Sequence, residues 1–192
     1  YKIACVNREC RETMEDIEAV LFMRTDGHET IEGPLDEIED FHVEDHCEFI
    51  GSLMCMAAAG AGKLDILKWL RQHKCHWNEY SLEEAAACGH LDVMQWAIEN
   101  GCPMYASVSH GPAESYEDNS LETLKFLHKH SCPFDEGTCV RAVCSGQFEK
   151  LVWLRSMPIN CPWDAGTTET ALRFCRWDML KFALDNGCPY HP

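Results

Sequence analysis

Apolar residues recur along this chain in a pattern that predicts pairs of short helices. In residues 84–103, three alanines from Ala85 onward favour a first helix, because alanine is the best helix former and adds little side-chain bulk. After a glycine, apolar residues from Leu91 onward recur at helical spacing and predict an amphipathic second helix. Asn100 and Gly101 are typical of a left-handed C-terminal cap, and the Cys-Pro that follows blocks continuation of the helix. The segment therefore predicts helix, turn, helix and stop.

The same pattern occurs five times. An aromatic residue marks each second helix, and the marks lie 27 to 30 positions apart at Trp69, Trp96, Phe126, Trp153 and Phe182. A cysteine follows six to eight residues later, at Cys75, Cys102, Cys132, Cys161 and Cys188. Small residues mark the first helices, at Ala58, Ala85, Ser115, Ala142 and Ala171. Units of this length cannot bury an apolar face alone and must stack. We therefore expect an all-α solenoid of five repeats over residues 54–192.

The run Ala-Ala-Cys-Gly-His-Leu-Asp-Val at residues 86–93 resembles the ankyrin repeat family. That family carries an alanine-rich first helix, Gly-His-Leu-Glu/Asp-Val, a second helix and an Asn-Gly ending. The units here are shorter than the usual length of about 33 residues, and the Thr-Pro-Leu-His opening is missing. The chain thus looks like the short, Trp- and Cys-rich variant found in some protists and large viruses. The resemblance implies helix-turn-helix repeats with shortened inter-repeat fingers and a protein-interaction scaffold.

Residues 1–53 differ in composition from the repeats. They hold fifteen Asp/Glu and four Lys/Arg, a net charge of −11 out of the total of −16. Residues 17–27 overlay on the second helix of repeat two, with Phe22 at the Trp96 position, and predict a divergent capping repeat. An acidic insertion without Lys or Arg follows at about residues 28–46. It is either a solvated segment that serves solubility or a docking surface for a basic partner.

Thirteen cysteines raise the question of disulfides and metals. Equivalent cysteines in stacked helices lie about 10 Å apart, too far for a disulfide. We therefore expect thiols used as small buried hydrophobes in a reducing compartment: cytosol, nucleus, or organelle matrix or stroma. Because the sequence starts at Tyr1, a targeting peptide is not excluded and the compartment stays open.

Histidines near these cysteines lie in different repeats, so we expect no metal and no cofactor. His73 and His130 fall at second-helix ends, where a capping role is expected. The remaining zinc alternative is His42, His46 and Cys47.

Other classes of function find no support in the sequence. It has no nucleophile elbow, phosphate loop or metalloprotease motif, so we expect no enzymatic activity. A net charge of −16 without a Lys/Arg cluster disfavours direct nucleic-acid binding. No apolar run is long enough for a transmembrane segment.

Candidate partner-binding residues lie in the connections between repeats. The position two residues after a repeated cysteine, which we call the aromatic slot, holds Trp77, Met104, Phe134 and Trp163. These side chains either cover the next repeat or form part of a binding strip. The neighbouring polar and aromatic residues are expected to be exposed and to bind a protein partner: Asn78, Glu79, Tyr80, Tyr105, Asp135, Glu136 and Asp164.

Repeat three is irregular. Residues 107–112 contain Gly111-Pro112, and residues 116–118 replace the Ala-Ala-Cys of repeat two, which predicts a broken first helix. We expect Tyr116, Glu117 and His110 to contact the partner. The predicted function is a scaffold or adaptor, and the alternative is a permanently bound structural subunit of a larger assembly. Permanent interfaces generally bury more than about 2,000 Å² and are more apolar.

Overall fold

The structure, a computed structural model, describes residues 48–72, 74–156 and 158–190. In these ranges it has ten α-helices, one 3₁₀-helix and no strand, so the all-helical prediction is confirmed. The helices follow one another in pairs: α2 (Glu48–Gly60) and α3 (Leu64–Gln72); α4 (Glu79–Ala87) and α5 (Leu91–Glu99); η4 (Ala106–Ser109) continued by α6 (His110–Glu114), and α7 (Ser120–Lys129); α8 (Glu136–Ser145) and α9 (Phe148–Arg155); α10 (Ala165–Arg173) and α11 (Trp177–Asp185).

Some sequence-based predictions fall outside these ranges. They are the capping repeat, the acidic insertion at about 28–46, the zinc alternative, and the capping role of His73. The predicted boundary at residue 53 falls within a helix, because α2 begins at Glu48.

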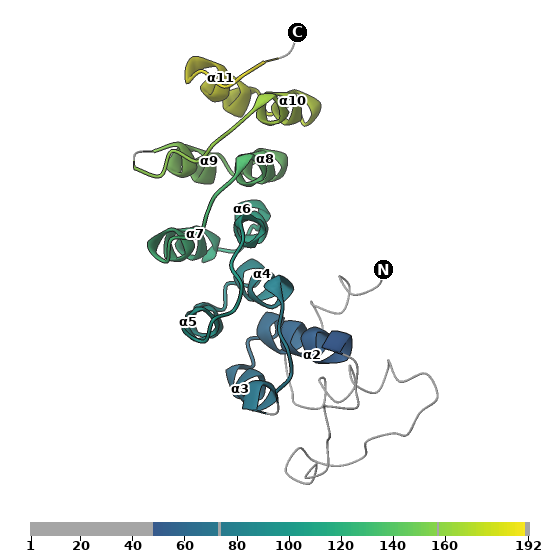
Figure 1. The fold of residues 1–192 in the computed structure, drawn as a ribbon. Coiled ribbons are helices and arrows are strands. Elements are labelled where there is room, and N and C mark those ends of the chain that lie inside the picture. The colour runs from purple at the N-terminus through teal and green to yellow at the C-terminus, as the bar shows by residue number, and fades with distance from the viewer. Residues whose placement is uncertain (1–47, 73, 157, 191–192) are drawn as a thin grey trace, which may run out of the picture.

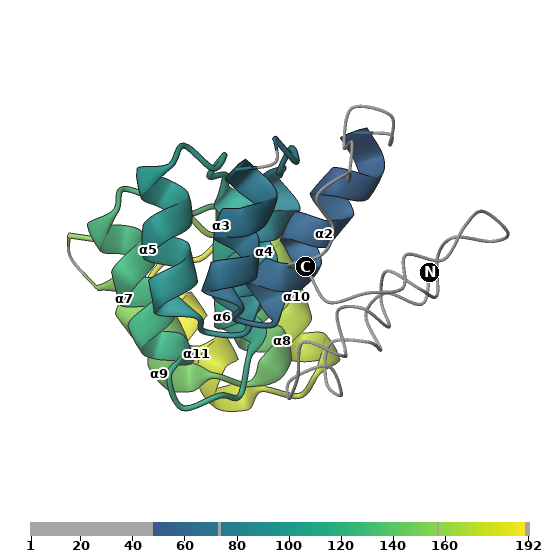
Figure 2. The ribbon, with the colours of Figure 1, turned by 90° about the horizontal axis from the view of Figure 1, so that it is seen from below.

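The pairs stack so that first and second helices form two separate rows. Figure 1 shows α2, α4, α6, α8 and α10 in one row and α3, α5, α7, α9 and α11 in the other. Within the first row each helix packs on the next, from α2 on α4 to α8 on α10. Figure 2 looks along the stack from the α2 end, and the later pairs lie behind the earlier ones.

Small residues let the first helices approach one another. Ala58, Ala85, Ala142 and Ala171 are at most 1% exposed. A Cβ added at Gly111 in α6 would lie 2.7 Å from the Cβ of Ala87 in α4, so any larger side chain would force these helices apart. Leucines from the second helices, such as Leu67, Leu127 and Leu154, fill the space between the rows and are fully buried.

All second helices except α9, which ends in an extended Ser156, end in a left-handed cap, and α5 shows the predicted one. Gly101 has φ 79°, its N–H donates to Ile98 O at 3.1 Å, and the N–H of Cys102 donates to Ala97 O at 2.9 Å. These two bonds define the Schellman motif, and they satisfy carbonyls that a helix end leaves free. The backbone N–H of the repeated cysteine is thus part of the helix stop.

As the sequence predicts, the first helix of repeat three is not one regular α-helix, but its two parts follow each other without a gap. Residues 106–114 are continuously helical, with a 3₁₀ start that changes to α-helix at His110. Its buried residues Val108, Ser109, Pro112 and Ala113 match the spacing of buried residues in α4 when both helices are counted from their starts. The extra residues 116–118 therefore lie in the turn between α6 and α7 and do not replace the Ala-Ala-Cys of repeat two.

Candidate interaction edge

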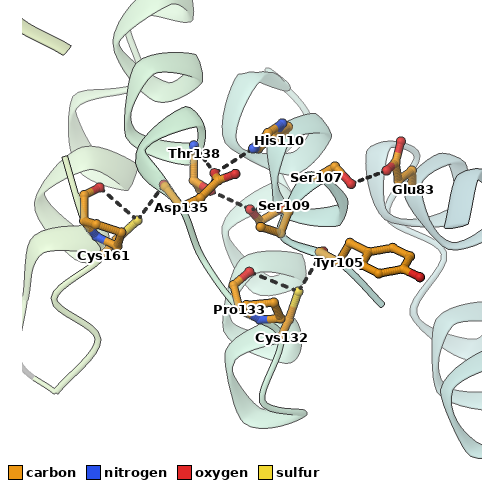
Figure 3. A network of polar contacts seen from close by, with 12 residues as sticks. Glu83, Tyr105, Ser107, Ser109, His110, Cys132, Pro133, Asp135, Thr138 and Cys161 are labelled. Carbon is orange, nitrogen blue, oxygen red and sulfur yellow. Dashed lines mark hydrogen bonds and ion pairs between the residues drawn. The ribbon is translucent and has the colours of Figure 1, made fainter. Parts of the chain in front are cut away.

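The first helices all begin along one side of the stack, which we call the connection edge and define by Asn78, Tyr105, Asp135 and Asp164. Each of these residues immediately precedes the first helix of a pair. The backbone carbonyl of each accepts a hydrogen bond from the repeated cysteine of the same pair. The four Sγ to O distances run from 3.2 to 3.7 Å: Cys102 to Asn78, Cys132 to Tyr105, Cys161 to Asp135 and Cys188 to Asp164. Figure 3 shows the two central examples. The start of each first helix is thereby attached to the end of its second helix.

Burial keeps the thiols of Cys102, Cys132 and Cys188 protonated and able to donate. It raises the pKa of Cys102 and of Cys132 to about 12, and it also raises the pKa of Cys188. The ten cysteines in the described ranges are free, and seven of them are buried. Four of the five repeated cysteines are therefore structural hydrogen-bond donors as well as small hydrophobes.

The aromatic slot after each cysteine covers the following pair. Trp77 packs edge-on against Trp96 with ring centroids 5.6 Å apart, and Trp163 packs in the same way on Phe182 at 6.2 Å. On the other side, the guanidinium of Arg155 lies 3.9 Å from the Trp163 ring centroid. These rings are only partly exposed. Of the two alternatives for this slot, the structure places the rings in the packing between pairs.

The predicted contact residues on the connection edge differ in exposure. Tyr80 and Tyr105 are 52% and 56% exposed, and Glu136 and Asp164 are also exposed. Asn78, Glu79 and Asp135 are half-buried. The buried Oδ1 of Asn78 has no hydrogen-bond partner. The two tyrosines therefore offer the largest accessible side chains of this set.

The two aspartates of the edge act as helix caps. Asp135 Oδ1 accepts from the N–H of Thr138 at 3.1 Å, and Asp164 Oδ1 accepts from the N–H of Gly166 at 3.0 Å. His110 Nε2 lies 2.7 Å from Asp135 Oδ1 and joins α6 to the start of α8, as Figure 3 shows. Partial burial alone would raise the pKa of Asp135, but the hydrogen bond and charge of His110 and the Thr138 donors together lower it.

Tyr116 and Glu117 lie away from the connection edge. The Tyr116 ring is 73% exposed, yet its hydroxyl donates to the carbonyl of Ser145 at 2.9 Å. Ser145 is the last residue of α8, whereas Asp135 precedes its first, and a ten-residue helix separates them by about 15 Å. The structure thus brings His110 and Asp135 together. It places Tyr116 and Glu117 on the opposite side of the first-helix row, where the first helices end.

His130, for which a capping role was predicted, is the C-cap residue of α7, and its ring packs on Phe126 with centroids 4.3 Å apart. The equivalent Asn100 caps through its side chain, because Nδ2 donates to Trp96 O at 2.8 Å. The histidine thus adds a ring contact at the helix end.

A buried lysine is the polar residue that sequence reasoning missed. Lys150 in α9 is 5% exposed, and its ammonium donates to the carbonyl of Pro112 at 2.9 Å and to that of Ser115. These carbonyls lie in the last turn and at the C-cap of α6, so Lys150 caps the short helix of the preceding pair. Burial lowers the pKa of Lys150 to about 8. The sequence does contain one sign of this burial, because the equivalent position is apolar in other repeats: Val93 in repeat two and Met179 in repeat five.

Neither a metal centre nor a membrane span is found in the part of the chain that the structure describes. No three His, Cys, Asp or Glu side chains there could hold a metal ion together. No helix there has the length and apolar character needed to cross a bilayer. Comparison of the whole chain with protein families, with curated proteins and with solved structures found no match.

Proposed function

We propose that this chain is a non-catalytic scaffold or adaptor, an ankyrin-like solenoid that binds a protein partner along the connection edge and the exposed side of the first helices. The observation that carries the proposal is the pair Tyr80 and Tyr105. Both rings are about half exposed, and they lie at consecutive first-helix starts, Tyr80 in the first turn of α4 and Tyr105 directly before η4. The backbones at these helix starts are held by the thiols of Cys102 and Cys132. Aromatic rings on a fixed backbone supply contact area with little loss of conformational freedom on binding.

The charge around these tyrosines favours a basic partner. Residues 75–124 contain nine Asp/Glu and no Lys or Arg. Within this range Glu83 accepts a hydrogen bond from Ser107, which is two residues after Tyr105, as Figure 3 shows. A partner segment with Lys or Arg beside an apolar anchor would match both the rings and the surrounding carboxylates.

A photo-crosslinking experiment tests this proposal. A benzophenone amino acid is placed at Tyr105 and, as a matched control, at Lys125 in α7 of the second-helix row, which is equally well exposed. We expect Tyr105 to crosslink a partner from the native source and Lys125 to give none. The same partner should bind at least tenfold more weakly to the Tyr80→Ala/Tyr105→Ala variant. Equal crosslinking at both positions, or unchanged affinity of the double variant, would contradict the proposal.

Native mass spectrometry of the complex addresses the manner of binding. An adaptor releases its partner on dilution. A complex that survives dilution and buries more than about 2,000 Å² would instead indicate the permanently bound structural subunit.

A further inference from the structure

The last helix pair presents an apolar surface at the end of the stack. Figure 1 shows α10 and α11 as the final layer, with no described helix beyond them. Five large apolar side chains of this pair and the segment after it are 36 to 62% exposed. We call them the terminal face: Leu172, Phe174, Trp177, Leu184 and Tyr190.

Two of these positions, those of Leu172 and Tyr190, are covered in the preceding pairs. The slot of Leu172 holds Ala59, Ala86 and Val143, which are each at most 1% exposed, whereas Leu172 is 36% exposed. The slot of Tyr190 holds Trp163, whose ring rests on the following pair through Phe182. The terminal face is therefore the stacking surface that an interior pair uses to contact its successor.

Leu172, Phe174 and Trp177 are also larger than Ala86, Cys88 and Leu91, which hold the same positions in repeat two. Trp177, at 62% exposure, stands where the earlier pairs have Leu64, Leu91, Leu121 and Phe148. An exposed apolar surface enlarged in this way is typical of an interface.

The charge of the last helix pair favours a second copy of this chain as the partner of the terminal face. The chain as a whole carries −16, so two copies repel each other over most of their surface. Residues 165–190 hold three Asp/Glu and three Lys/Arg and are neutral. Exposed Arg173 adjoins Leu172 and Phe174 in sequence, and exposed Asp178 adjoins Trp177. A two-fold axis can set each of these charges against its opposite in the other copy.

We propose that two copies of this chain associate end to end through their terminal faces. Large side chains of this kind cover about 150–250 Å² each, so five at about half exposure supply roughly 400–500 Å² per copy. Pairing would bury about 1,000 Å² in total, near the lower limit of specific interfaces. The dimer is therefore reversible, and it leaves the connection edge of each copy accessible.

Sedimentation velocity of the full chain under reducing conditions tests this dimer. The range from about 1 µM to about 1 mM covers the dissociation constants of interfaces near this size. We expect a monomer that converts to a dimer as concentration rises. Trp177→Glu should raise the dissociation constant at least tenfold without loss of fold, because an acidic residue is favourable in the first turn of α11. Tyr80→Glu is the matched control, since Tyr80 is also a half-exposed aromatic in the first turn of its helix, and it should leave dimerisation unchanged.

Three results would overturn the proposal. The first is a chain that stays monomeric up to the highest concentration. The second is a dimer that Trp177→Glu leaves intact while circular dichroism shows the variant folded. The third is a mass that grows beyond the dimer, which would indicate head-to-tail association through two different surfaces.

Discussion

Replacing Lys150 by Met tests whether a buried ammonium stabilises the short helix α6. Methionine retains the length of the stem and removes the two hydrogen bonds to Pro112 O and Ser115 O. Hydrogen bonds from a charged donor contribute about 1.5–3 kcal/mol each, or about 3–6 kcal/mol for the two. Burying the ammonium opposes this stabilisation. Burial lowers the pKa of Lys150 from 10.5 to about 8, which corresponds to a cost of about 3 kcal/mol. We therefore expect Lys150→Met to lower the free energy of unfolding by about 2 kcal/mol at pH 7.

The pH dependence of that difference gives a second, independent readout. Between pH 8 and 10.5 the unfolded lysine keeps its proton while the folded amine has lost it. The wild-type chain therefore gains stability relative to the variant as pH rises through this window. The neutral amine still has N–H groups for both carbonyls, so the cap itself remains. From pH 7 to pH 9.5 the difference should grow by about 2 kcal/mol, at about 1.4 kcal/mol per pH unit above pH 8.

Urea denaturation followed by circular dichroism at both pH values measures these free energies. Lys181→Met is the control, because Lys181 is exposed and its ion pair with Asp185 lies on the surface. This control should leave stability and its pH dependence nearly unchanged. A Lys150→Met variant as stable as the wild type at pH 7 would refute the capping role. A difference that shrinks towards pH 9.5 would show that the two carbonyls hold the ammonium in its charged form.

Two further predictions concern the turns and the thiols. Gly146→Ala should destabilise the chain by at least 1 kcal/mol more than Gly187→Ala in thermal unfolding. Both glycines have φ near 77°, but an added Cβ at Gly146 would lie 2.7 Å from the guanidinium carbon of Arg176, whereas nothing lies within 4 Å at Gly187. Equal losses would show that the arginine moves away freely. The stability of the wild type should fall above pH 9, because the unfolded Cys102 thiol ionises there while the folded thiol keeps its proton up to a pKa of about 12. Cys102→Ala should lessen this fall by about 1.4 kcal/mol per pH unit in denaturant titrations, and an unchanged slope would contradict a buried, protonated thiol.

Local signals were enough to predict the helical class and the helix stops. Asn100 and Gly101 form the predicted cap because its geometry depends on neighbouring residues alone. Ser115 does not take the position of Ala85, because the chain from α6 to Phe126 is three residues longer than its counterpart in repeat two and the distance to Phe126 is therefore misleading. Pro112, ten residues after Cys102 as Ala85 is after Cys75, holds that buried position.

Contacts between repeats could not be read from the sequence in the same way. The pairing of His110 with Asp135 depends on how α6 and α8 pack, and each residue alone looked like an exposed polar group. The same holds for the Tyr116 hydroxyl, which is bound to Ser145 O despite an exposed ring. Equivalent positions in successive repeats are more informative than single residues: Lys150 holds a position that is Val93 in repeat two and Met179 in repeat five, which indicates that it is buried.

The hydrogen bonds that join neighbouring pairs span short stretches of chain. His90 contacts the carbonyl of Gly60 thirty residues earlier, Asn119 contacts that of Gly89 at the same separation, and the longest of those described, from Lys150 to Pro112, spans 38 residues. The loop that must close before each contact forms is therefore small, and its entropic cost is similar at every step. Folding can start at any well-packed pair and extend to its neighbours, and fraying can begin at an end without disturbing distant pairs.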